Sequence, residues 1–181
     1  MNRSLLALAA PILFAIAAPV AVAASAQQQV DPLRFFAGQT ETEGTVKIMF
    51  NKPFRSRSLG QGRVEPDGSL ILVQRVEDEG KPPRERRWRV REAGPGHWTA
   101  AMSEAVGPVA IDQVGDRYRF RFKMKGNLAV EQWLAPLPGA RAARTITKAR
   151  KFGMTVMTSE GTVRKLPAAR GPHPQTPAVA D

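Results

Sequence analysis

The chain contains no cysteine. This absence excludes a disulfide framework, a thiolate nucleophile and a thiolate metal site, and it leaves no residue for lipidation after an export signal. Histidine is scarce as well, because the sequence has only His97 and His173. A metal site built from histidine needs several clustered ligands, which these two positions do not supply. We therefore predict no metal site and no cofactor.

Known catalytic patterns are also missing from the sequence. It contains no Ser-x-x-Lys, no Gly-x-Ser-x-Gly and no zinc motif. General acid–base chemistry needs a positioned base, and the few candidates are His97, Glu104, Asp112 and Glu131. We predict a protein that is not an enzyme and has no catalytic residue. A His97 that points into a pocket beside a carboxylate would favour catalysis instead.

The two ends of the chain have compositions that differ from the rest. Residues 1–26 have the pattern of a secretory signal peptide, with one cation, Arg3, before an apolar run over residues 5–22 and small residues at the end. Because no cysteine follows this signal, we predict a periplasmic protein rather than a lipoprotein. Residues 167–181 are rich in proline and poor in apolar side chains, which predicts a disordered tail.

The chain is strongly basic, with a formal net charge of +11. Removal of the signal takes away Arg3 and no acid, so the mature charge is 11 − 1 = +10. Such an excess indicates a negative partner: anionic lipid head groups, lipopolysaccharide, another polyanion or nucleic acid. A solvated basic surface without a partner is the plain alternative. The export signal and the lack of any nucleic-acid-binding motif argue against nucleic acid as a physiological partner.

Between the two ends, apolar and polar residues alternate from residue 45 onward, and turn residues recur about every ten positions. This spacing predicts a meander of short antiparallel strands. We expect strands at 45–50, 57–64, 69–77, 84–92, 97–103, 107–112, 117–125, 128–135, 144–150 and 153–164. Asp31, Pro32 and Gly38 suit the cap, the first turn and the end of a short preceding helix. The prediction is one all-β domain over residues 31–166, a single antiparallel up-and-down β-barrel of about 8–10 strands.

The segment from Asp116 to Leu134 shows the alternation most clearly. Over the nine residues 117–125 every second residue is a cation, at Arg117, Arg119, Arg121, Lys123 and Lys125, and the residues between them are Tyr118, Phe120, Phe122 and Met124. In a half-buried antiparallel strand such a pattern places the apolar side chains inside and the cations outside.

The turn within this segment, around Gly126 and Asn127, can be tested by its consequences for the two faces. Directly opposed residues of an antiparallel pair must lie on the same face of the sheet. A two-residue loop would oppose Phe122 to Glu131 and so mix the faces, whereas a three-residue loop opposes Phe122 to Val130. We therefore predict the three-residue loop. It also places Arg121 across from Glu131 as an ion pair, and Arg119 across from Trp133 as a cation–π contact.

Two polar residues are expected on the inner face. Gln132 faces inward in this register, and a buried amide costs about 1–3 kcal/mol unless a neighbour or a ligand satisfies it. Arg86 shares a face with Trp88, so it either meets an anion or reaches water at a strand end. The interior candidates for ligand binding are Arg86, Trp88, Trp98, Tyr118, Phe120, Phe122 and Gln132. The candidates for an anion-binding outer surface are Arg87, Arg89, Arg91, Arg117, Arg119, Arg121, Lys123 and Lys125.

Several short motifs, in their order and spacing, resemble a bacterial family known as domain of unknown function 3833. They are Phe35-Phe36-Ala37-Gly38, Glu43-Gly44, Asp67-Gly68, Arg86-x-Trp88, Gly126-Asn127 and Lys151-Phe152-Gly153. The family consists of small exported chains, often lipoproteins. The resemblance spans about residues 31–166 and implies a lipocalin-like barrel. It implies no catalytic residues.

These observations favour a binding protein of the cell envelope. Small barrels enclose either packed side chains or one small ligand, so we expect a hydrophobic or amphipathic, lipid-like small molecule inside. The alternative is an envelope protein that holds anionic lipid, lipopolysaccharide or another polyanion on its basic outer face. An outer-membrane barrel with aromatic side chains toward lipid is a further possibility, although the short strands and the single tyrosine argue against it.

Overall fold

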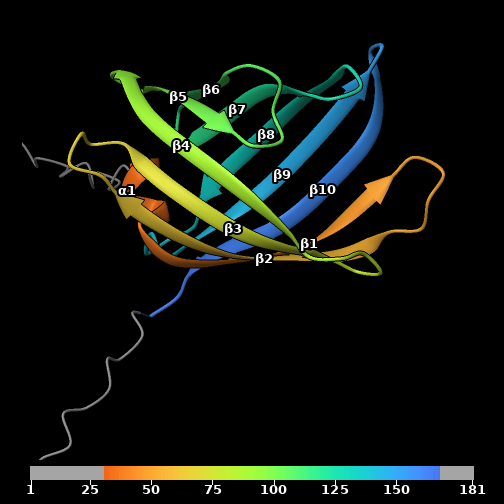
Figure 1. Ribbon diagram of the computed structural model, residues 1–181, viewed down its shortest axis with the longest axis horizontal. Helices are drawn as coiled ribbons and strands as arrows, with labels where there is room; N and C mark the ends of the chain where they lie inside the picture. Colours follow the sequence, from red (N-terminus) through yellow and green to blue (C-terminus); the bar gives the residue numbers. More distant parts are fainter. Residues whose placement is uncertain (1–30, 168–181) are drawn as a thin grey trace, which may run out of the picture.

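Ten antiparallel strands form one closed barrel in the computed structural model, which describes residues 31–167 (Figure 1). The elements are α1 (Pro32–Phe36), β1 (Gly38–Ile48), β2 (Phe54–Val64), β3 (Leu70–Asp78), β4 (Arg84–Gly94), β5 (His97–Met102), β6 (Val109–Val114), β7 (Arg117–Met124), β8 (Leu128–Pro136), β9 (Ala142–Lys151) and β10 (Met154–Lys165). Each strand pairs with its neighbours in sequence, and β1 closes the barrel against β10. The expected all-β, antiparallel, up-and-down barrel with a short N-terminal helix is confirmed.

Strand β1 begins at Gly38, well before the expected residue 45. The polar segment that opens it lacked the large apolar side chains by which a strand is recognised. It is nevertheless a strand because it pairs on both sides, with Thr42 opposite Ser58 of β2 and Val163 of β10. Its inward side chains are small and polar, so apolar alternation did not reveal it.

Closure of the barrel depends on a close approach of β1 and β10. Gly44 and Gly161 are directly opposed there. A Cβ atom on Gly161 would lie 2.5 Å from the Glu43 carbonyl oxygen, and one on Gly44 would overlap the Glu160 carbonyl oxygen. Glycine is therefore required at both positions, because only its hydrogen fits between the two backbones.

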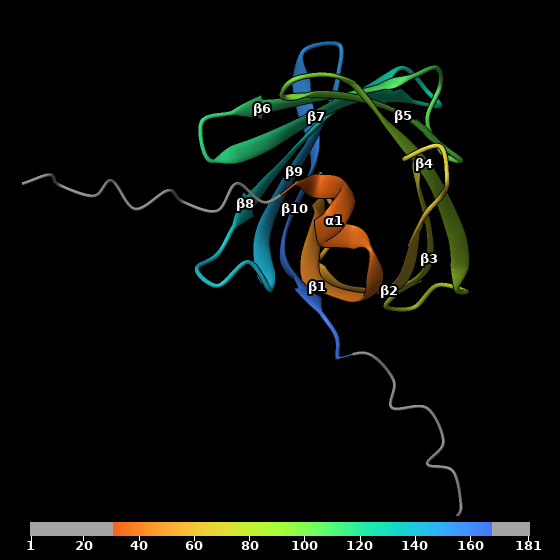
Figure 2. The same cartoon turned by 90° about the vertical axis from the view of Figure 1, so that its left-hand side faces the viewer.

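Helix α1 fills one end of the barrel and lies within the ring of strands when the molecule is viewed from that end (Figure 2). Phe35 is buried in the core, and its ring meets the Phe36 ring edge to face at 5.0 Å. The Lys165 ammonium donates a hydrogen bond of 2.8 Å to the Arg34 carbonyl. A Cβ atom on Gly62 would overlap the Phe36 carbonyl oxygen, so the helix rests directly on the backbone of β2.

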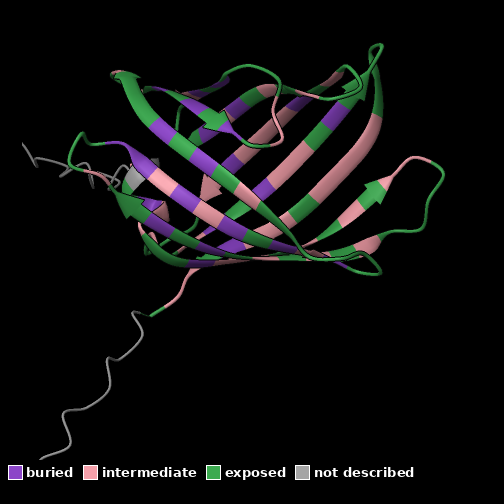
Figure 3. Ribbon diagram, viewed as in Figure 1, coloured by how far each residue is buried: buried purple, intermediate pink, exposed green. Residues whose placement is uncertain are grey.

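The bulky interior side chains gather around α1. Trp98 meets Tyr118 edge to face at 5.7 Å, and Trp88 meets Phe120 at 6.4 Å. Along β3 and in the middle of β4 buried residues alternate with more exposed ones, as the bands of Figure 3 show. The barrel is therefore packed at the α1 end by large side chains from β3 to β8.

The β7–β8 hairpin has the predicted three-residue loop, and Phe122 lies opposite Val130. The cation–π contact is also confirmed, since the Arg119 guanidinium lies 5.7 Å from the Trp133 ring centroid. The cations of β7 point outward.

The predicted ion pair between Arg121 and Glu131 is wrong. The Arg121 guanidinium instead donates to Asp112 on β6, the other neighbour of β7, over 2.8 Å. The Glu131 carboxylate accepts a hydrogen bond of 3.1 Å from the Trp133 indole. Asp112 is the better partner for Arg121 because its carboxylate also lies 3.7 Å from Arg119 and is fixed by both guanidinium groups.

Some expectations fall outside the described residues. These are the signal peptide at 1–26 and the disordered tail at 167–181, of which only Pro167 is described. Within residues 31–167, no helix is long and apolar enough to cross a membrane.

The contrast between two phenylalanines tests the packing of α1. Phe35 is 2% exposed and Phe50 is 97% exposed. We expect Phe35→Ala to lower the free energy of unfolding by about 3–5 kcal/mol, because it leaves a cavity in the core. Phe50→Ala should change it by less than about 0.5 kcal/mol. Urea denaturation of both variants measures the difference, and equal losses would contradict the packing described here.

Candidate ligand-binding site

Inward-facing side chains differ in size around the barrel. The strands β1, β2, β9 and β10 carry small residues at the inward positions of their middle parts. These are Thr42, Gly44, Ser56, Ser58, Thr145, Thr147, Ser159 and Gly161. On the opposite wall β4 and β7 carry Trp88, Phe120 and Phe122. Space therefore remains in the interior next to the small-residue wall.

That space forms two adjoining chambers. The outer chamber has a volume of about 360 Å³ and extends to the barrel end opposite α1, where Ile48, Phe54 and Met124 line it. The deep chamber has a volume of about 110 Å³ and is lined at its far end by Phe36 of α1. Both chambers share one ring of residues. The ring consists of Thr42, Ser58, Arg86, Trp88, Gln132 and Thr145.

The two chambers differ in polarity. Beyond the shared ring, the deep chamber is lined by Phe36, Leu70, Leu72, Gln74, Val90, Ile111, Phe120 and Val163, among which only Gln74 is polar. The Gln74 side-chain oxygen accepts a hydrogen bond of 3.0 Å from the Trp88 indole. The outer chamber combines apolar side chains with hydroxyl groups and ionised groups. A molecule that spanned both chambers would contact mainly apolar side chains in the deep chamber and polar and charged side chains in the outer chamber.

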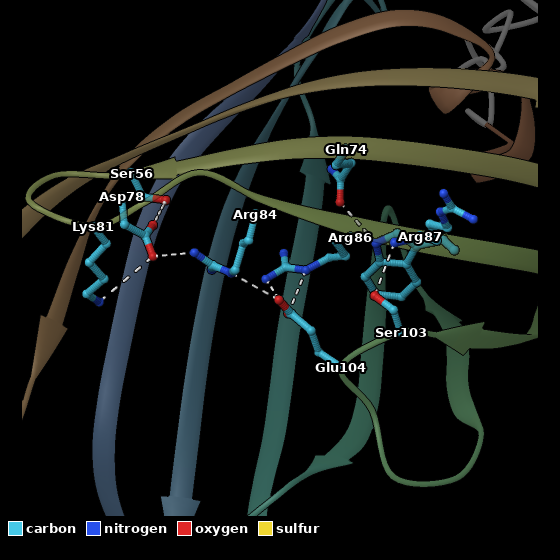
Figure 4. Close-up of polar contacts among 10 residues, drawn as sticks. Ser56, Gln74, Asp78, Lys81, Arg84, Arg86, Arg87, Ser103 and Glu104 are labelled. Carbon is cyan, nitrogen blue, oxygen red and sulfur yellow. Dashed lines mark hydrogen bonds and ion pairs between the residues drawn. The ribbon is translucent and has the colours of Figure 1, made fainter.

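One wall of the outer chamber is charged, and Glu104 lies at its centre (Figure 4). The Glu104 carboxylate accepts hydrogen bonds from Arg86 at 2.8 Å and from Arg84 at 3.0 Å. A second contact of 2.6 Å joins the Arg86 guanidinium to the same carboxylate. Glu104 lies just after β5, and its carboxylate reaches across to the inward face of β4. Arg86, whose environment the sequence left open, is therefore directed into the barrel and paired there.

The second carboxylate of this wall is Asp78, at the end of β3. It accepts hydrogen bonds of 2.6 Å from the Ser56 hydroxyl and of 2.6 Å from the Arg84 guanidinium. The Lys81 ammonium lies 3.9 Å away. Burial raises the pKa of the Asp78 carboxyl, but the hydrogen bonds from Ser56 and Arg84 outweigh it, so the pKa lies below its ordinary value.

The charges on this wall do not cancel. Three cations, Lys81, Arg84 and Arg86, face two carboxylates, Asp78 and Glu104. The wall therefore has a net charge of +1, counted as 3 − 2. Within a partly enclosed cavity such an excess attracts anions more strongly than the same charge in bulk water.

Gln132 is an unpaired polar group in the interior. Its half-buried side chain lines both chambers, and its side-chain amide forms no hydrogen bond with residues 31–167. The sequence offered two interpretations, a neighbour or a ligand, and the described residues supply no neighbour. Its amide can both donate and accept a hydrogen bond, so it is available to a molecule in the cavity.

The predicted interior residues occupy different places. Arg86, Trp88 and Gln132 lie in the shared ring, Phe122 lines the outer chamber and Phe120 lines the deep one. Trp98 and Tyr118 line neither chamber and pack against each other in the core.

Sequence reasoning missed the carboxylates and the small polar side chains of the cavity. Alternation along β2 places Ser56 and Ser58 on the same face as Phe54, which is a usable signal. Glu104 gave no such signal, because it lies in a loop. Whether its side chain points into the barrel depends on the conformation of that loop, which has no periodic pattern.

The predicted anion-binding surface is not one continuous strip. Strands β5 and β6 separate Arg87, Arg89 and Arg91 on β4 from the cations on β7. Several of these side chains also have a carboxylate partner: Arg87, Arg89, Arg117, Arg119 and Arg121. Among the described residues no carboxylate pairs with Arg91, Lys123 or Lys125.

His97 lies on the outside of the barrel. Its side chain is 63% exposed, and Nδ1 lies 3.0 Å from the Asp112 carboxylate. This pair lines neither chamber. In the part of the chain that the structure describes, no group of three or more histidine, aspartate or glutamate side chains could hold a metal ion.

Comparison with known proteins gives a family and a structural relative. A family model described as "Protein of unknown function (DUF3833)" matches residues 12–159. No curated protein matches the chain. A solved structure of an S-type phycobiliprotein lyase, CPES, from Guillardia theta is similar with a TM-score of 0.58 and 7% sequence identity, covering 76% of this chain and 92% of that chain. At this identity the likeness concerns the fold, and it confirms the lipocalin-like fold class.

The low pKa of Asp78 leads to a prediction about acid stability. Because the folded-state pKa lies below that of the unfolded chain, about 3.9, ionised Asp78 stabilises the fold above that pH. This contribution is lost as the pH falls through the folded-state pKa. We expect Asp78→Asn to reduce the free energy of unfolding at neutral pH and to make the decline of that free energy in acid less steep.

Urea denaturation across acidic pH measures both effects. Parallel curves for Asp78→Asn and wild type would contradict the prediction.

Proposed function

The chain belongs to the DUF3833 family of proteins of unknown function, and from the two chambers of its barrel we propose that it binds one amphipathic, lipid-like small molecule. The observation that carries this proposal is an interior cavity with an apolar floor and a net positive wall. The outer chamber, at about 360 Å³, is within the size range of small-molecule sites.

The polar group of the ligand is expected at the shared ring. Arg86 lies in the ring and belongs to the wall whose cations outnumber its carboxylates. Gln132 lies in the same ring, and its side-chain amide forms no hydrogen bond with residues 31–167. An anionic head group placed there would accept hydrogen bonds from both side chains and balance the excess charge. The apolar part of the ligand would enter the deep chamber beside Phe36 and Phe120.

Glu104 has a defined role in this proposal. Its carboxylate holds the Arg86 guanidinium while the cavity contains no anion. An incoming anionic group would share Arg86 with Glu104 rather than meet an unpaired cation. This arrangement avoids the cost of a buried unpaired charge before binding, and it lowers the affinity because the ligand competes with an existing partner.

We place this binding function in the cell envelope. The signal-like pattern of residues 1–26 supports export, and the absence of cysteine favours a periplasmic protein without a lipid anchor. We propose binding rather than catalysis because His97, the best candidate base, lies on the outer face with Asp112. The lyase named in the structural comparison shares the fold at 7% identity, which carries no activity over to this chain.

Mass spectrometry tests the proposal directly. The protein is purified gently from the envelope of its own host, and lipids and small molecules extracted from it are measured. We expect a stoichiometric amphipathic molecule. A protein that repeatedly contains no such molecule, and that fails to bind the two probes described next, would refute the proposal.

A pair of fluorescent probes separates the two parts of the site. Anilinonaphthalene sulfonate carries an anionic group, and N-phenylnaphthylamine is its uncharged analogue. We expect Arg86→Met to weaken binding of the sulfonate about tenfold, since hydrogen bonds to charged groups contribute about 1.5–3 kcal/mol. The affinity for the uncharged probe should change little.

The matched control for this measurement is Arg75→Met. Arg75 is an exposed arginine on the neighbouring strand and pairs with Glu77 at 2.8 Å, outside the cavity. The Arg75→Met substitution should leave the affinity for both probes unchanged. Equal weakening by the two substitutions, or equal weakening of both probes by Arg86→Met, would contradict the assigned role of Arg86.

A further inference from the structure

The most exposed large apolar side chains within residues 31–167 all lie at the open end of the barrel. They are Phe50, Phe152, Met154 and Val106. Phe50 lies in the β1–β2 hairpin and is 97% exposed, and Phe152 lies in the β9–β10 hairpin and is 78% exposed. The two hairpins come from adjacent strands and project from the end opposite α1 (Figure 1). A hydrogen bond of 2.9 Å from the Met49 amide to the Val156 carbonyl joins them at their base.

Folding does not account for phenylalanine at these two tips. Phe50 has a φ of 65° and Phe152 has a φ of 50°, in the left-handed region that bulky residues rarely adopt. Phe152 and Gly153 form a two-residue hairpin loop with positive φ at both positions, where Asn-Gly is the common choice. Each residue therefore has a strained backbone while most of its side chain is exposed, and the Lys151 ammonium lies 5.7 Å from the centroid of the Phe152 ring. Backbone strain of this kind is often retained for a function.

The same hairpins are basic. The segments 47–55, 123–128 and 148–155, which form three adjacent hairpins around the rim, contain no acidic residue. Their cations are Lys47, Lys52, Arg55, Lys123, Lys125, Lys148, Arg150 and Lys151. None of these side chains pairs with a carboxylate among the described residues. The other two loops of this end carry Glu79 and Glu104, and Glu104 faces the cavity.

The opposite end has a different composition. Its β2–β3 hairpin carries Glu65 and Asp67 beside Arg63, and its β6–β7 turn carries Asp116 beside Arg117. The exposed apolar residues there, Val64, Val114 and Leu137, are smaller and less exposed than the two phenylalanines. Exposed aromatic side chains and unpaired cations therefore coincide at the open end alone among the described parts of the barrel.

We infer that the open rim is a docking surface for anionic lipid bilayers. The Phe50 and Phe152 rings enter the interface between head groups and acyl chains, while the surrounding lysines and arginines contact anionic head groups. Aromatic insertion combined with basic residues is the established physical basis of peripheral membrane binding. Docked in this way, the outer chamber opens toward the lipid surface. The docking does not depend on a ligand in the cavity, so the two proposals can fail separately.

Vesicle cosedimentation tests the docking. The full chain is mixed with vesicles of phosphatidylcholine alone or of phosphatidylcholine with phosphatidylglycerol. We expect binding only to the anionic vesicles and weaker binding at high salt, because exposed charges are screened. Absence of binding to the anionic vesicles would overturn the proposal.

Two double substitutions, each with a matched control pair, separate insertion from charge. Phe50→Ser with Phe152→Ser should reduce the affinity for anionic vesicles at least tenfold, since it removes two apolar side chains from the interface. Val64→Ser with Leu137→Ser, at the other end, should leave it unchanged. Lys52→Gln with Lys151→Gln should reduce it by about fivefold per cation, while Arg91→Gln with Arg141→Gln should not.

Each alternative gives a distinct result. Binding that depends on the lysines and not on the phenylalanines would indicate contact with a polyanion and would overturn insertion. Equal losses in the two charge pairs would place the contact outside the rim and would overturn it as well. Because all four positions of the phenylalanine and control pairs are exposed, circular dichroism should show a native fold in every variant.

A site-specific label determines the orientation. The chain has no cysteine, so a single introduced cysteine is labelled uniquely. An environment-sensitive fluorophore on Met154→Cys should shift its emission to the blue on anionic vesicles, whereas the same label on Leu137→Cys should not. A shift at position 137 instead, at the α1 end where the described chain begins, would refute docking through the rim.

Discussion

Closure of ten strands into one sheet is the constraint on which the rest of this structure depends. The diameter of a barrel grows with the number of strands, and about eight strands already enclose just enough space for side chains or one small ligand. With ten strands, the inward side chains can fill the whole interior only if they are large on every wall. Here the walls of β1, β2, β9 and β10 carry small residues. The cavity follows from that combination of strand number and side-chain size.

Electrostatics determines what the cavity can accept. Water is partly excluded inside the barrel, so each charge there needs a partner. Asp78 and Glu104 provide partners for Arg84 and Arg86, and the hydrogen bonds that result are short. The excess positive charge of this wall and the Gln132 side-chain amide, which forms no hydrogen bond with residues 31–167, support our proposal of a ligand with an anionic group. The paired charges of this wall and its excess cation are the features on which the proposed class of ligand rests.

The two ends of the barrel differ in packing and in surface chemistry. At one end α1 contributes Phe35 to the core, and Gly62 allows its backbone to rest on β2. This end gives the barrel its packing. At the other end the hairpins carry exposed rings and unpaired cations around the opening. A closed end and an open, basic end give the molecule a direction, which a symmetrical barrel would lack.

Alternation and turn residues along the chain were enough to predict ten strands, although not the first part of β1. They also predicted the inner and outer faces and the three-residue loop of the β7–β8 hairpin, because these follow from period and from local pairing. Arg86 and Gln132 could be placed inside for the same reason. The partner of Arg121 could not be predicted, because it lies on β6 and the choice between Asp112 and Glu131 depends on side-chain reach across the sheet. The direction of Glu104 was equally hidden, since a loop has no periodic face. Only the closed structure brings the small residues of β1, β2, β9 and β10 to one wall and so creates the cavity, because its volume depends on which strands oppose each other across the barrel.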